Sequence, residues 1–161
     1  MKIKEIKTVI KEYNDKSELS AEDINLINIA REASKKAYAP YSGFKVGAAL
    51  LLENGEIIEA NNQENVSYPA GLCAERIAIF YAGAKYPDVP AKALALTAFK
   101  DHEFIDEPVT PCGSCRQTLF EHESRFNSSI RLILAGKKKI IIVDKVGDLL
   151  PLEFDKTYLE R

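Results

Sequence analysis

The sequence has no excess of basic residues, and this absence narrows the range of partners. Its 22 Lys and Arg residues are balanced by 24 Asp and Glu residues, which leaves a formal net charge of −2 at pH 7. Proteins that bind a nucleic-acid backbone generally carry a clear excess of Lys and Arg. We therefore expect no nucleic-acid polymer as a partner.

Long apolar segments are also absent. The run at residues 46–52 is one of the longest, and it is far shorter than the roughly 20 residues of a membrane-spanning helix. Charged side chains at Glu5, Lys7 and Lys11 interrupt any apolar core of a secretory signal. These features predict a cytoplasmic protein with no membrane partner.

Cysteine and histidine are scarce, with three cysteines and two histidines in the whole chain. The cysteines are Cys73, Cys112 and Cys115. An odd number of cysteines in a reducing compartment argues against a framework of disulfide bonds. The sulfurs are therefore expected to bind something other than one another.

The length of 161 residues, with 46% hydrophobic residues, suits one domain that buries about 70% of its unfolded surface. Residues 1–18 are charged and rich in lysine. They are predicted to form an N-terminal appendage that contains an edge strand, and residues 19–161 a single domain.

Helical spacing of apolar residues predicts three helices. Ser20 and Asp23 resemble a helix cap, and the spacing that follows predicts a helix over 21–38. A second helix is expected to begin beside Cys73 and to run to Gly83, and a third to open at Pro111–Cys112.

Five apolar or β-branched segments are predicted as strands, and residues 100–108 as a surface loop. The strands are expected at 45–52, 56–62, 92–99, 130–134 and 140–143. Strands and helices alternate along the chain, which is typical of helices packed on a sheet. The sequence thus predicts an α/β fold with three α/β/α layers around a mixed five-stranded sheet.

The three cysteines lie at the predicted starts of two helices, where amide N–H groups and the helix dipole favour a thiolate. Cys112 and Cys115 form a Cys-x-x-Cys pair that can bind one tetrahedral ion, and Cys73 can reach it from the other helix. Three ligands leave one position of a zinc ion for water, as in catalytic zinc sites.

Two neighbours of Cys73 suit such a site. Three thiolates around a zinc ion leave a net charge of −1, which the guanidinium of Arg76 and the two helix dipoles can offset. Glu75 lies close enough to face a water on the metal and to move its protons.

Other interpretations of these residues stay open. A Cys-x-x-Cys pair alone also occurs in structural zinc sites and redox dithiols. His102 or His122 could supply a fourth ligand and close the site, which would make the chain a noncatalytic zinc-binding module. Since His102 lies in a charged loop and His122 near a helix end, we expect both to be exposed to solvent.

Five segments together resemble the cytidine deaminases of the small, homotetrameric type with three zinc-binding cysteines. They are Tyr38–Phe44, Val46–Ala49, Asn62–Asn65, Cys73–Arg76 and Pro111–Gln117. The His-or-Cys, x, Glu element followed by Pro-Cys-x-x-Cys is the signature of zinc nucleobase deaminases. The resemblance covers about residues 29–154 and implies a cytidine deaminase-like fold.

The resemblance implies a zinc-dependent hydrolase that converts cytidine and 2′-deoxycytidine to uridine and 2′-deoxyuridine plus ammonia, in pyrimidine salvage. Cys73, Cys112 and Cys115 would hold one Zn²⁺ per subunit. Glu75 would pass protons from the zinc-bound water, which attacks C4, to N3 and then to the departing amine. The implied partners are a nucleoside substrate and three further copies of the chain, with sites near subunit interfaces.

The resemblance also implies substrate contacts. Phe44 would pack on the pyrimidine ring, Asn62 and Glu64 would hydrogen-bond the ribose 3′-hydroxyl, and Ala74 would contact substrate. Phe154 would reach a neighbouring subunit's site. Without the resemblance, Asn62 and Glu64 suit a turn after a strand, and Phe44 the core. A deaminase of another nucleoside, such as a blasticidin-like antibiotic, is the alternative within the same chemistry.

Overall fold

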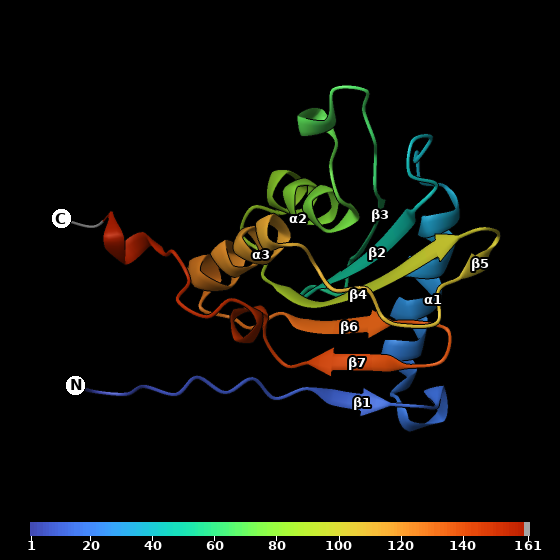
Figure 1. Ribbon diagram of the computed structural model, residues 1–161. Helices are drawn as coiled ribbons and strands as arrows, with labels where there is room; N and C mark the ends of the chain where they lie inside the picture. The colour runs from blue at the N-terminus through green and yellow to red at the C-terminus, as the bar shows by residue number, and fades with distance from the viewer. Residues whose placement is uncertain (160–161) are drawn as a thin grey trace.

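A mixed β-sheet forms the centre of the computed structural model, which describes residues 1–159 (Figure 1). Within these residues the sheet has seven strands, in the order β1-β7-β6-β4-β2-β3, with β5 paired to β4. The strands are β1 (Lys11–Tyr13), β2 (Lys45–Leu52), β3 (Ile57–Asn61), β4 (Ala91–Lys100), β5 (Glu103–Phe104), β6 (Arg131–Ala135) and β7 (Ile140–Val143). Strands β4 and β6 are parallel, and the other neighbours are antiparallel.

The predicted mixed sheet is confirmed, but the count of five strands is too low by two. Strand β1 is the edge strand expected within the appendage, which the count of five left out, and β5 lies within the predicted loop 100–108. Strand β5 follows a tight turn in which Asp101 and His102 have positive φ angles of 50° and 69°. Strands of two or three residues are too short to show a hydrophobic period.

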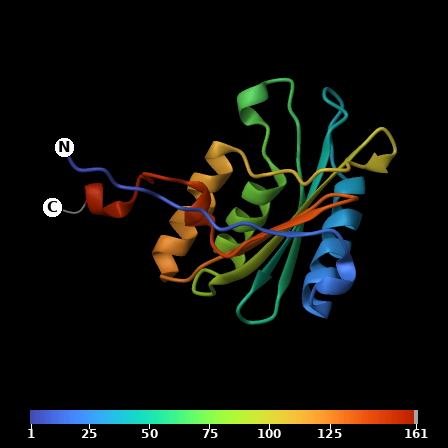
Figure 2. The same cartoon turned by 60° about the horizontal axis from the view of Figure 1, so that its bottom comes forward.

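Helices cover both faces of the sheet. They are α1 (Ala21–Lys35), α2 (Ala74–Lys85) and α3 (Gly113–Phe126). Figure 2 shows α1 on one side of the sheet, and α2 and α3 on the other. Strand β2 is apolar from Val46 to its end because it is covered on both sides. Ala48 and Leu50 pack with the α2 and α3 layer, and Ala49 and Leu51 with α1. The predicted three-layer architecture is confirmed.

Two helices end at other residues than predicted. Helix α1 begins as expected, with the Ser20 hydroxyl accepting a hydrogen bond from the Asp23 N–H at 3.1 Å, but it ends at Lys35 rather than residue 38. The reason is that the backbone of Tyr38 pairs with the segment after β3 instead, at residues 62 and 64. Helix α2 continues past the predicted end, Gly83, to Lys85.

The N-terminal segment joins the sheet only at its end. Strand β1 pairs with β7 at the edge, as the prediction of an edge strand requires, and the Lys11 Nζ lies 2.7 Å from the Asp144 carboxylate. Residues 1–10 are exposed and extend away from the sheet (Figure 1). None of the helices within residues 1–159 has the length and apolar character to span a membrane.

At Gly47 the backbones of α1 and β2 are in close contact. A Cβ atom at this position would overlap the Ala30 carbonyl oxygen and lie 2.5 Å from the Ser34 backbone nitrogen. We expect Gly47→Ala to lower the free energy of unfolding by roughly 1–3 kcal/mol, because an overpacked core must shift its backbone. Denaturant unfolding measures this change.

The matched control is Gly83→Ala in α2, where a Cβ would have nothing within 4 Å. Alanine favours a helix over glycine by up to about 1 kcal/mol, so this variant should be as stable as the parent or more stable. Equal stability of the two variants would contradict the close α1–β2 contact.

Candidate metal centre and active site

The three cysteines meet where α2 and α3 begin. Cys73 is the N-cap residue of α2, Cys112 is the N-cap residue of α3, and Cys115 lies in the first turn of α3. Their sulfur atoms all lie within 4.8 Å of one another, and the Sγ atoms of Cys112 and Cys115 are 3.5 Å apart. The fold thus gathers all three residues that the sequence analysis assigned to a metal.

The surroundings of the sulfurs favour negative charge on Cys73. A hydrogen bond from the Cys115 thiol lowers the pKa of Cys73 to about 5, and the Arg76 guanidinium, with Nη2 at 3.8 Å from the Sγ, adds to the effect. The same hydrogen bond and burial raise the pKa of Cys115. The position of Cys73 therefore favours the thiolate form that binds a metal ion.

These donors fit a zinc ion. Among residues 1–159, the cluster of metal-binding atoms consists of three sulfurs, with no histidine nitrogen or carboxylate oxygen. Thiolates are preferred zinc ligands, and three of them leave one coordination position open. The Nε of Arg76 is buried without a hydrogen-bond partner among the described residues, while its Nη2 lies 3.8 Å from the Cys73 Sγ.

The histidines lie outside the cluster. His102 is exposed, as predicted, but the same prediction for His122 is wrong, because this side chain is only 8% exposed. Its Nε2 accepts a hydrogen bond from the Ala91 N–H at 3.0 Å. Burial, together with the nearby Arg125, lowers the pKa of His122 to about 4. His122 is thus a neutral structural residue, and the described residues give no support to a closed four-ligand site.

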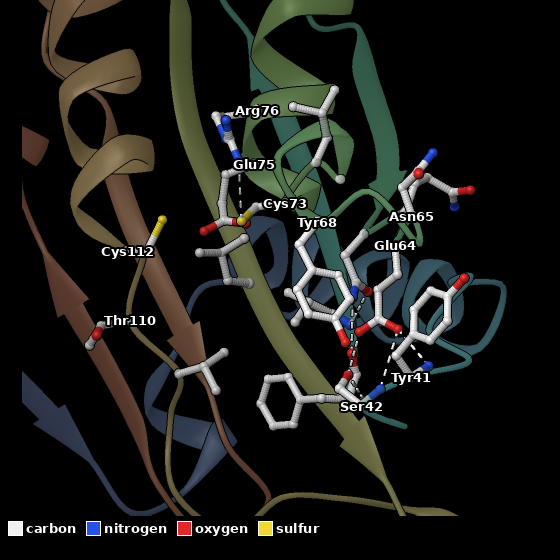
Figure 3. A pocket seen from close by; sticks show the side chains of 18 residues that line it. Tyr41, Ser42, Glu64, Asn65, Tyr68, Cys73, Glu75, Arg76, Thr110 and Cys112 are labelled. Atoms are coloured by element: carbon white, nitrogen blue, oxygen red, sulfur yellow. Dashed lines mark hydrogen bonds between the residues drawn. The ribbon is translucent and has the colours of Figure 1, made fainter.

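A cavity of about 810 Å³ opens beside the cysteines (Figure 3). Most of the predicted site residues line it: Phe44, Asn62, Glu64, Cys73, Glu75, Arg76 and Cys112. Phe44 belongs to the loop before β2, and Asn62 and Glu64 follow β3. The cavity therefore connects the metal cluster with residues that lie far from it in the sequence.

Glu75 lies in the first turn of α2 and is only 5% exposed. Burial raises the pKa of its carboxyl group above the ordinary value. A carboxyl group whose pKa moves toward neutrality exchanges protons readily with a neighbouring group. Glu75 therefore has the position and the electrostatics of a general acid and base.

Asn62 and Glu64 line the part of the cavity wall that lies across from the cysteines and Glu75. The Asn62 amide accepts a hydrogen bond from the Val46 N–H at 2.7 Å and donates one to the Phe44 carbonyl at 2.9 Å. This leaves one amide N–H and one lone pair for a ligand. The Asn62 side chain thus orients the loop that carries Phe44.

The Glu64 carboxylate accepts hydrogen bonds from the Ser42 hydroxyl at 2.5 Å and from the Tyr41 N–H at 2.8 Å. These bonds, the Ser42 hydroxyl first, lower the pKa of Glu64. Glu64 is therefore an anion that can accept further hydrogen bonds from a ligand.

Three predicted residues are not part of the cavity lining in the described residues 1–159, and one of them is the fully buried metal-ligand candidate Cys115. Ala74 is buried between Cys73 and Glu75, and Phe154 is 56% exposed on the C-terminal segment. Conversely, Tyr41 and Tyr68 line the cavity and contact each other edge to face, with ring centroids 6.1 Å apart. Neither tyrosine was assigned a role from the sequence, since only the folded loops bring them together.

The three-layer fold, with a cysteine triad and a buried glutamate at the starts of two helices, defines a zinc-dependent deaminase. Residues 20–127 match the family model described as the cytidine and deoxycytidylate deaminase zinc-binding region. The chain belongs to this family.

Curated relatives and solved structures agree with this assignment. A cytidine deaminase of Sporosarcina psychrophila is 41% identical over 131 residues, which cover 81% of this chain and 90% of the relative. One of Halalkalibacterium halodurans is 44% identical over 96 residues, or 60% of this chain and 68% of the relative. The crystal structure of cytidine deaminase from Burkholderia pseudomallei has a TM-score of 0.70 and 36% identity, and the match covers 84% of this chain and all of that one.

Proposed function

We propose that this chain hydrolyses cytidine and 2′-deoxycytidine to uridine and 2′-deoxyuridine, with release of ammonia. The observation that carries this proposal is the buried carboxylate of Glu75 beside three sulfurs, at one end of a cavity whose other wall presents Asn62 and Glu64. Family membership and the names of the relatives support the same substrates.

Cys73, Cys112 and Cys115 would hold the zinc ion. When bound, zinc supplies a Lewis acid that lowers the pKa of water at its open position. Glu75 would take one proton from the water that attacks C4 and deliver it to ring N3. It would then carry the second proton, from the new C4 hydroxyl group, to the amine, so that the C4–N bond breaks and ammonia leaves. Its raised pKa suits both transfers, because the carboxyl group must accept and donate a proton in one turnover.

The opposite wall of the cavity would bind the nucleoside. Phe44 packs against the pyrimidine ring, and Asn62 and Glu64 hydrogen-bond the 3′-hydroxyl of the sugar. Both have hydrogen-bonding capacity beyond their bonds to the Phe44 loop. A ligand without the sugar leaves these polar groups unpaired, which costs binding energy. Ala74, between a metal ligand and Glu75, is proposed as a further contact.

The proposal includes a homotetramer in the cytoplasm, working in pyrimidine salvage. Phe154 is exposed on the C-terminal segment, where a neighbouring subunit can receive it. Residues 19–161 would form the single deaminase domain, with residues 1–18 as its appendage.

Incubation of the zinc-loaded protein with nucleosides tests the substrate class directly. We expect cytidine and 2′-deoxycytidine to yield uridine products and equal amounts of ammonia, measured by chromatography and an ammonia assay. Free cytosine should react far more slowly, since it cannot pair with Asn62 and Glu64. Equal rates for cytosine and cytidine would contradict the proposed sugar contacts, and an antibiotic nucleoside as the preferred substrate would favour the alternative deaminase.

Replacement of Glu75 tests the proton transfers. We expect Glu75→Ala and Glu75→Gln to keep one zinc per chain and to lose roughly 10²–10⁴-fold in turnover, the usual contribution of a positioned general acid and base. Zinc is measured by elemental analysis and turnover by uridine formation. The matched control is Glu121→Ala on the exposed side of α3, which should keep full turnover. Near-normal turnover in either Glu75 variant would remove Glu75 from the mechanism.

A further inference from the structure

The segment that carries Cys112 has few hydrogen bonds to the rest of the protein. It runs from the end of β5 to the start of α3 and contains Pro108 and Pro111, which have no backbone N–H. Within the described chain, the backbone of residues 107–111 makes one hydrogen bond, in which the Nε of Arg116 donates to the Pro111 carbonyl oxygen at 2.8 Å. The residue directly before Cys112 is buried, and its carbonyl oxygen is held by a single side chain.

Arg116 is itself held on its other side. Its Nη1 donates to the Leu149 carbonyl oxygen at 3.0 Å, in the short 3₁₀ helix Val146–Leu149. The buried carboxylate of Glu123 accepts hydrogen bonds from the N–H groups of Val146 at 2.9 Å and Gly147 at 3.0 Å. The guanidinium of Arg116 thus connects the Cys112 segment to a firmly anchored part of the C-terminal region.

We propose that Arg116 is a positioning residue for the metal centre: by holding the Pro111 carbonyl, it keeps the Cys112 sulfur in place and slows the loss of zinc. This inference rests on the proposed ligand set, in which Cys112 binds the metal. Cys112 is the exposed member of the triad, so it is the ligand with the least support from packing. Groups that orient a metal ligand commonly change metal affinity by 10–100-fold when they are removed.

The shape of the arginine side chain matters for this role. A guanidinium presents several N–H donors in a rigid plane and can reach two carbonyl oxygens in different directions. A lysine ammonium group at the same position keeps the positive charge but lacks the rigid planar arrangement of N–H donors. Arg116→Lys should therefore show an intermediate effect, which separates the hydrogen-bond geometry from the charge.

The test measures the rate at which zinc passes from the folded protein to a coloured chelator. We expect Arg116→Gln to release zinc about 10–100-fold faster than the parent. The matched control is Arg125→Gln, because Arg125 also lies on α3 and its Nη2 donates to a proline carbonyl, that of Pro87, at 2.5 Å. This control should release zinc at the parent's rate.

Cobalt(II) substitution gives a second measurement that a merely structural role would not change. The visible absorption of cobalt depends on the geometry of its ligands, so Arg116→Gln should shift the spectrum and Arg125→Gln should not. If Arg116→Gln does not fold, the same comparison is made with Arg116→Lys, which should release zinc faster than Arg125→Gln.

A stably folded Arg116 variant with the release rate and the cobalt spectrum of the control would overturn the positioning role. Failure of the ligand set itself is distinguishable, because Cys112→Ala would then retain zinc with the parent's release rate. We expect Cys112→Ala instead to lose its metal.

Discussion

Three cysteine sulfurs within 4.8 Å of one another concentrate negative charge, and much of the surrounding structure serves to offset it. Cys73 and Cys112 cap two helices, so the partial positive charge of two helix N-termini faces the cluster. Arg76 adds a full positive charge beside Cys73. We propose that this compensation lets a zinc ion with three thiolate ligands still acidify a bound water.

The sheet provides the rigid base for that arrangement. Helices α2 and α3 lie on the same face and share one apolar cluster with alternate residues of β2, β4 and β6. The packing of both helices on this face brings their N-termini together at the cysteine cluster. The loops before β2 and after β3 then close the cavity, linked to each other by Asn62 and Glu64.

Much of this structure could be predicted from the sequence. The apolar run at residues 45–52 indicated the strand β2, and the Cys-x-x-Cys pair at a helix start indicated two ligands of one ion. The burial of His122 could not be predicted, because its partner is a backbone N–H at the start of β4, 31 residues away. The same holds for the bond from Arg116 to Leu149, which depends on where the C-terminal region folds back. Roles for Phe44 and Glu64 came from family resemblance, since their residue types alone suit a core or a turn.

The central claim is a zinc ion held by three sulfurs with its fourth position open to water. X-ray absorption spectroscopy at the zinc edge of the native protein tests it most directly. The account predicts three sulfur atoms at about 2.3 Å and one oxygen atom at about 2.0 Å from zinc. A fourth protein ligand, either sulfur or imidazole, would contradict the account, as would a fully active preparation that contains no metal.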